Sequence, residues 1–301
     1  MAFSTAPSSI AASSGSFSPL PAELLILVYS RLPSFQDVFS LASTCHRLQD
    51  IWLKNIATIY KPVARAAIPC EKYARILLAD QGGPSPESEI TTASDVARMI
   101  QNMQVVDQAI HQFESKIVSK VRARGHRTED YYGAGARRHP PYLTRTERPR
   151  FIRSYYRFWA LLTIDDPVER QSRLQSMSFK QLLYLCEMSW PPKSMGPGEE
   201  AIKTPVYPGV TPAQRYQARR ALSKLVVDHT ESTYRRIHGK EMEAIWVIAM
   251  DEGYDNFLVM WDHWQSSLID VVCSRRSREP PYKKEFHMEL WDDSSEEETE
   301  R

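Results

Sequence analysis

The sequence predicts an all-α protein, and two observations support that fold class. Apolar residues recur every three or four positions in successive segments from residue 20 to about residue 275, which is the spacing of one face of a helix. No segment is rich in strand signals, and no internal repeat with a period of about 20 to 50 residues occurs. We therefore expect a small three-helix bundle, a larger irregular helical domain and disordered termini.

Composition places the chain among globular proteins. Of its 301 residues, 42% are hydrophobic and 25% are charged, and the formal net charge of +1 gives no general electrostatic reason to expect nucleic acid or a membrane as partner. The apolar run from Leu24 to Tyr29 is far shorter than the roughly 20 residues that span a bilayer, as is every other uninterrupted apolar run of the sequence. The four cysteines Cys45, Cys70, Cys186 and Cys273 form no C-x-x-C pair, which is typical of reduced thiols, so we expect a cytoplasmic or nuclear location or both.

Residues 20–59 predict the small bundle. The first helix begins at Pro21, because proline suits the first helical position, and Leu24 to Tyr29 are apolar around the whole circumference. Residues 35–45 and 48–59 each supply one apolar face. A unit of about 40 residues is at the lower limit of independent folding. We therefore expect something outside the bundle to cover its remaining apolar surface.

The same stretch resembles the F-box family. The family pattern is Leu-Pro-x-Glu-Leu-Leu with an aliphatic residue four positions after the first of the paired leucines, then Leu-Pro, Asp-Leu, a Leu and a Val-Cys-Arg run. The matching residues here are Leu20, Pro21, Glu23, Leu24, Leu25, Val28, Leu32, Pro33, Asp37, Val38, Leu41 and Cys45. Two departures are a turn before Asp37 that is one residue longer than usual, and Thr44 and Leu48 where Val and Trp are common.

The resemblance implies a non-catalytic substrate-recognition subunit of an SCF-type ubiquitin ligase in the ubiquitin-like conjugation pathway. The implied partners are the Skp adaptor, the cullin scaffold and an unknown protein substrate held by the C-terminal helical domain. The implied adaptor-binding residues are Leu20, Pro21, Leu24, Leu25, Val28, Leu32, Val38, Leu41 and Cys45. The sequence does not divide them between building the bundle and facing the adaptor. The competing interpretation is that these helices simply pack on the rest of the chain.

A loop and a long helix are expected next. Lys61-Pro62 is expected to end the third helix, Pro69 to separate two short helices, and the Gly- and Pro-rich residues 81–90 to form a loop. Between residues 92 and 122, apolar residues alternate separations of three and four, at Val96, Met99, Met103, Val106, Ile110, Phe113 and Ile117. This pattern fits a dimerisation seam or a long helix within a helical domain. We favour the second, because methionine is a weak seam residue.

Residues 122–150 are expected to form a long loop in a basic region. Residues 115–157 hold twelve Lys or Arg and three acidic residues, a local net charge of +9, interleaved with Tyr131, Tyr132, Tyr142, Phe151, Tyr155 and Tyr156. Such mixtures can stack on single-stranded nucleic acid, so a nucleic-acid-binding regulatory protein is the alternative function. A solvated loop that meets an acidic segment explains the charge as well, and the near-zero overall charge makes nucleic acid the weaker alternative.

Further helices are expected at 151–164, 179–190, 212–238, 240–252 and 255–274, with an extended connection at 193–212. The Arg-rich Tyr-Tyr/Trp segment at 151–164 also resembles fungal F-box proteins without a recognised substrate-binding repeat. In the last helix Phe257, Trp261 and Trp264 share a face, which is either core or, if exposed, the first candidate for a substrate-binding surface.

The expected domains are a disordered lead-in at 1–14, the F-box at 15–60, a helical domain at 61–275 and an acidic disordered tail at 276–301. Residues 285–301 carry eight acidic residues and one Arg, and Ser294 and Ser295 resemble acidophilic kinase sites. A plain solubilising tail without phosphorylation explains this composition at least as well. No phosphate loop, G-x-S-x-G elbow or H-E-x-x-H pair occurs, and the eight histidines are dispersed. We therefore expect no catalytic residue, no metal ligand and no cofactor.

Overall fold

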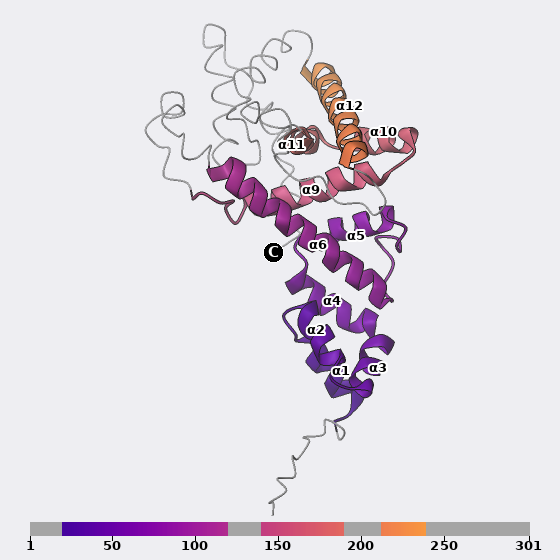
Figure 1. The fold of residues 1–301 in the computed structure, drawn as a ribbon. Helices are drawn as coiled ribbons and strands as arrows, with labels where there is room; N and C mark the ends of the chain where they lie inside the picture. The colour runs from indigo at the N-terminus through magenta and orange to yellow at the C-terminus, as the bar shows by residue number, and fades with distance from the viewer. Residues whose placement is uncertain (1–19, 120–139, 190–211, 239–301) are drawn as a thin grey trace, which may run out of the picture. The chain divides into compact units, whose positions relative to one another are not determined.

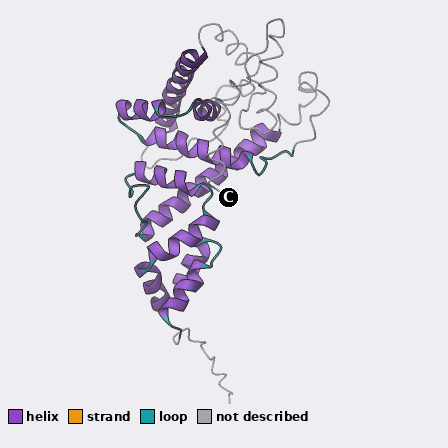
Figure 2. Cartoon of the chain, turned by 180° about the vertical axis from the view of Figure 1, so that it is seen from behind, coloured by secondary structure: helices purple, strands orange, loops and turns teal. Residues whose placement is uncertain are grey.

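The structure is a computed structural model that describes residues 20–119, 140–189 and 212–238. Every regular element in those residues is a helix, so the all-α prediction is confirmed (Figures 1 and 2). The chain divides into two compact units. Of the described residues, unit 1 holds 20–67 and 91–93, and unit 2 holds 68–90, 94–119, 140–189 and 212–238. The boundary between them follows residue 67, whereas the sequence suggested residue 60.

Unit 1 contains four helices rather than three. They are α1 (Ala22–Ser30), α2 (Phe35–Ala42), α3 (His46–Lys54) and α4 (Ile56–Ala67). The expected third helix is interrupted at Asn55, whose backbone leaves helical geometry and whose side-chain amide donates to the Ile51 carbonyl at 2.8 Å. Pro62 lies inside α4 instead of ending a helix. The backbone bond that Pro62 cannot make would go to Thr58, which is exposed, so water can satisfy that carbonyl.

The core of unit 1 forms where the apolar faces of the four helices meet. Helix α1 packs against α3 and α4, and α2 packs against the same two helices. The Phe35 ring stacks on Tyr60 at 5.6 Å between centroids, and Tyr29 lies 6.5 Å from Trp52. At its start α2 is capped by Ser34, whose hydroxyl accepts from the Asp37 amide at 3.2 Å.

Unit 2 is arranged around α9. Its described helices are α5 (Glu71–Asp80), α6 (Ala93–Phe113), the π-helical turn η1 (Glu114–Val118), α9 (Glu147–Thr163), α10 (Pro167–Gln175), α11 (Phe179–Ser189) and α12 (Pro212–His238). Helix α9 packs against α5, α11 and α12 (Figure 1). The sequence predicted a single apolar stripe on this helix, but ten of the eleven residues from 151 to 161 are buried, because neighbours surround it on several sides.

The predicted long helix is confirmed. Helix α6 and η1 together cover residues 93–118. The seam residues Val96, Met99, Val106, Ile110 and Phe113 are at most 2% exposed. These five residues are buried in the chain's own fold, which favours a long helix within a helical domain over a dimerisation seam.

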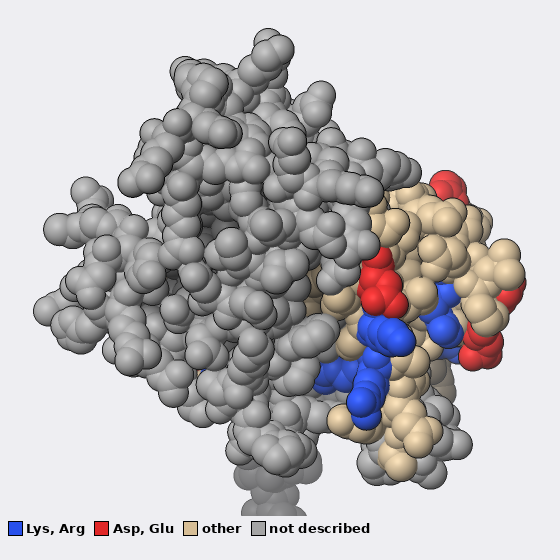
Figure 3. Space-filling view, turned by 90° about the horizontal axis from the view of Figure 1, so that it is seen from above, with Lys and Arg blue, Asp and Glu red and all other residues tan. Residues whose placement is uncertain are grey.

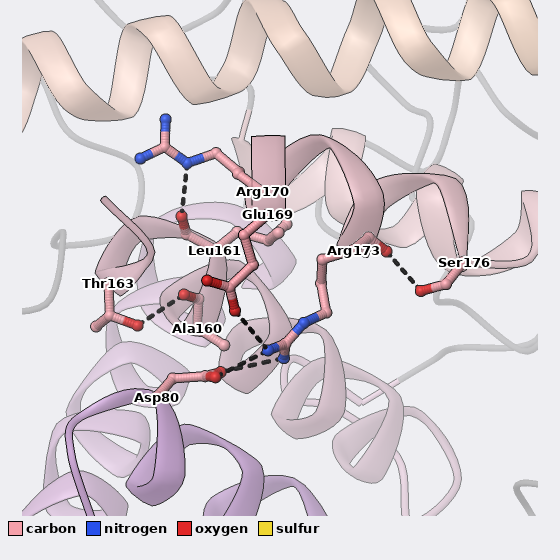
Figure 4. A network of polar contacts seen from close by, with 8 residues as sticks. All are labelled: Asp80, Ala160, Leu161, Thr163, Glu169, Arg170, Arg173 and Ser176. Atoms are coloured by element: carbon pink, nitrogen blue, oxygen red, sulfur yellow. Dashed lines mark hydrogen bonds and ion pairs between the residues drawn. The ribbon is translucent and has the colours of Figure 1, made fainter. Parts of the chain in front are cut away.

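Helix α10 was not predicted, and polar contacts fix it in unit 2. Arg173 forms a bidentate ion pair with Asp80 of α5, with nitrogen–oxygen distances of 2.9 and 3.2 Å (Figure 4). Arg170 donates to the carbonyls of Leu161 and Ile164 at the end of α9. Only Leu174 of α10 is buried, so the helix gives almost no apolar periodicity for the sequence to reveal.

Several expectations fall outside the described residues. They are the lead-in at 1–14, most of the basic loop, the connection at 193–211, the helices at 240–252 and 255–274, the aromatic stripe of Phe257, Trp261 and Trp264, and the acidic tail with Ser294 and Ser295. Among the helices of the described ranges, none is both long and apolar enough to cross a membrane.

Candidate partner-binding surface

Helix α1 carries an exposed apolar face. Leu24, Leu27 and Val28 are 47%, 53% and 46% exposed, and residues three and four apart lie on the same side of a helix. Leu25 and Tyr29, one turn apart on the other side, are buried in unit 1. The helix therefore has apolar side chains on both sides, and the unit covers only one of them. We call Leu24, Leu27 and Val28 the α1 face.

Tyr29 fixes the rotation of α1 about its axis and so decides which leucines are displayed. Its buried hydroxyl donates to the Leu48 carbonyl of α3 at 3.0 Å. The Arg47 guanidinium, also on α3, donates to the Leu20 carbonyl just before α1. Because these two bonds hold both ends of α1 against α3, the α1 face is turned away from the core of unit 1.

Burial, together with the nearby Cys45 thiol, raises the pKa of Tyr29 from 10.0 to about 12. A raised pKa means that the folded unit favours the neutral phenol. The resulting stabilisation is complete below the unfolded pKa of about 10 and is lost as the pH rises through about 12. Alkaline pH should therefore loosen the contact that orients the α1 face.

We expect Tyr29→Phe to lower the free energy of unfolding of unit 1 by about 1 kcal/mol at neutral pH, through loss of the hydrogen bond to Leu48. The difference between wild type and variant should shrink between about pH 10 and 12, because wild type alone must then keep the Tyr29 phenol protonated. Urea unfolding across that range measures it. A difference that stays constant with pH would show that Tyr29 titrates normally.

The structure divides the nine residues that the resemblance assigned to adaptor binding. Leu25 and Val38 are 2% and 0% exposed, so they belong to the core of the bundle. Leu24, Val28, Pro21 and Cys45 are exposed, and Leu20, Leu32 and Leu41 are half-buried. The family pattern omitted Leu27. Its position three residues after Leu24 on an apolar helix was the available signal.

The basic aromatic region does not form a stacking surface in its described part. Phe151, Tyr155 and Tyr156 are core residues of α9, between 0% and 2% exposed, and Tyr142 is the exposed aromatic among residues 140–157. Tyr131 and Tyr132 lie outside the described residues. On the face drawn in Figure 3, the described Lys and Arg side chains lie beside Asp and Glu side chains. Three of the six aromatics proposed for stacking therefore cannot meet a base.

Within residues 20–119, 140–189 and 212–238, no group of three or more His, Cys, Asp or Glu side chains is placed to hold a metal ion. Compared with models of protein families, with curated proteins and with solved structures, the chain matches none of them. The function has to be argued from the α1 face and from the residue pattern that it carries.

Proposed function

We propose that unit 1 is an F-box that docks on the Skp adaptor, and that the chain is a substrate-recognition subunit of an SCF-type ubiquitin ligase. The observation that carries the proposal is the α1 face: three large apolar side chains of one short helix are about half exposed in a unit that buries other apolar residues in a core. Leu24 and Val28 of that face are also positions of the F-box pattern.

A partner that covered the α1 face would gain apolar burial. Full burial of a Leu or Val side chain is worth about 1.5–3 kcal/mol, and each of these side chains still exposes about half of its surface. Three adjacent half-exposed side chains therefore offer a few kcal/mol of association free energy. Water would be excluded from the centre of the contact that they form. That is the energetic role expected of an adaptor-facing helix.

In this proposal the chain has no chemistry of its own and acts by proximity. Unit 1 attaches to the adaptor and through it to the cullin scaffold, and unit 2 holds a protein substrate. Tethering the substrate near a charged ubiquitin-conjugating enzyme raises its effective concentration, which accelerates transfer without a catalytic residue in this chain. Such a complex would work in the cytoplasm or the nucleus.

Co-purification of the full-length chain with a tagged Skp adaptor tests the proposal. We expect wild type to be retained, and Leu24→Asp combined with Val28→Asp to abolish retention, since both new charges would be desolvated at the contact. The matched control is Leu53→Asp, because Leu53 of α3 is 48% exposed in the same unit and is not an F-box position.

Circular dichroism would establish that the double variant is still folded. If wild type is not retained, or if the folded double variant is retained as well as the Leu53→Asp control, the α1 face is not an adaptor-binding surface. The docking role would then have to be withdrawn.

A further inference from the structure

The loop that joins α5 to α6 presents a Ser-Pro pair to solvent. Its residues 84–86 are Pro-Ser-Pro, and Ser85 is exposed. Pro86 occupies the second position of a turn that is closed by the Ser88 amide donating to the Ser85 carbonyl at 2.9 Å, a position that proline favours. The Ser85 hydroxyl donates to Glu87 Oε2 at 2.5 Å. Ser85 is therefore the exposed first residue of a hydrogen-bonded turn.

An arginine lies beside this turn. Arg75 of α5 donates to the Ser88 carbonyl, and it pairs with Glu71 at 3.7 Å. Its Nε is buried and has no hydrogen-bond partner. The Ser85 hydroxyl, the backbone amide of Glu87 and the positive charge of Arg75 lower the pKa of Glu87. The guanidinium therefore already exerts its field on the group that Ser85 contacts.

We propose that Ser85 is phosphorylated by a proline-directed protein kinase and that Arg75 holds the resulting phosphate. In the reaction the Ser85 oxygen bonds to the γ-phosphorus of ATP, its proton passes to the base of the kinase, and ADP leaves with the electrons of the broken phosphoanhydride bond. Pro86 supplies the residue by which kinases of this class select their serine. The proposal is independent of the α1 face and of the ubiquitin-ligase role.

The charges around Ser85 determine where the phosphate would go. Esterification removes the hydroxyl proton that Glu87 now accepts, and the phosphate brings a charge of about −1.5 to −2. Glu87 is then repelled, whereas Arg75 offers a cation whose planar donors suit phosphate oxygens. The turn would exchange the contact between Ser85 and Glu87 for one between phosphoserine and Arg75.

Treatment of the full-length chain with a purified proline-directed kinase and ATP, followed by mapping of the phosphate by mass spectrometry, tests the modification. We expect phosphate at Ser85 in wild type and none there in Ser85→Ala. In Pro86→Ala, which keeps the serine, the rate should fall at least about tenfold, equivalent to about 1.4 kcal/mol of discrimination. An unmodified Ser85 in wild type, or an equal rate in Pro86→Ala, would overturn the proposed site.

Phosphorus NMR of the phosphorylated chain tests the role of Arg75. The second pKa of the phosphate should be about half a unit lower in wild type than in Arg75→Gln, because a neighbouring cation favours the dianion. The control is Lys72→Gln, which removes a positive charge from an exposed position of the same helix and should leave that pKa unchanged. Equal values in wild type and Arg75→Gln would show that Arg75 does not hold the phosphate.

Discussion

Replacing Phe151 by alanine should lower the free energy of unfolding of unit 2 by about 3–5 kcal/mol. Phe151 is 0% exposed, its ring lies 4.8 Å from Phe113 of α6, and it stacks on Tyr155 at 6.0 Å. The substitution removes both ring contacts and leaves a cavity between α6 and α9, which close-packed neighbours can fill only in part. Denaturant unfolding of the full-length chain, followed by circular dichroism, measures the loss.

Tyr142→Ala is the matched control for this substitution. Tyr142 belongs to the same basic aromatic region but is 56% exposed, so its loss should change stability by no more than about 0.5 kcal/mol. Equal effects of the two substitutions would mean that Phe151 is not a core residue. The aromatic residues of α9 would then again be available to stack on nucleic acid.

The sequence predicted helices well where apolar spacing and helix-ending residues agree. Helix α12 begins at Pro212 and ends at His238, as expected from a proline at its first position and Gly239 after its last. The long helix beginning at Ala93 was predicted from the spacing of its buried residues. In both cases the local signals and the tertiary packing select the same conformation.

Elements held by polar contacts or surrounded on all sides were harder to predict. Helix α10 is fixed by Arg170 and Arg173, and ion pairs between distant segments leave no periodic pattern in the sequence. In α9, Arg150 and Arg153 are buried beside the aromatic residues. The high local charge of the basic region predicted that these arginines would be solvated. Composition does not reveal how many helices pack around a segment.

The candidate site was predicted as a region but not residue by residue. Leu24 and Leu25 are adjacent and chemically identical, and the pattern includes both. Their side chains differ only in the direction in which they project from the α1 axis. The rotation of α1, and with it that direction, is set by the hydrogen bond from Tyr29 to the Leu48 carbonyl of α3. A contact across nineteen positions of sequence cannot be inferred from the spacing within one helix.

Because Leu25 is buried and Leu24 is exposed, the second large effect on stability is expected at Leu25. Leu25→Ala should lower the free energy of unfolding of unit 1 by about 2–5 kcal/mol, because it removes a side chain that is 2% exposed from a small core. A core of this size rarely provides more than about 3–5 kcal/mol of stability, so much of unit 1 should unfold. Hydrogen exchange of residues 20–67 in the full-length chain would report the loss, and unit 2 should retain its protection.

Leu24→Ala removes the same atoms from the neighbouring position and should change the stability of unit 1 by about 0.5 kcal/mol or less. Under the proposed function, retention on the Skp adaptor should respond differently: Leu24→Ala should weaken it in a folded unit, whereas Leu25→Ala should abolish it by unfolding unit 1. Should Leu24→Ala unfold residues 20–67 as strongly as Leu25→Ala does, the side chain of Leu24 is needed for the bundle itself. The α1 face would then have no apolar surface to spare for a partner, and the proposed docking would lose its physical basis.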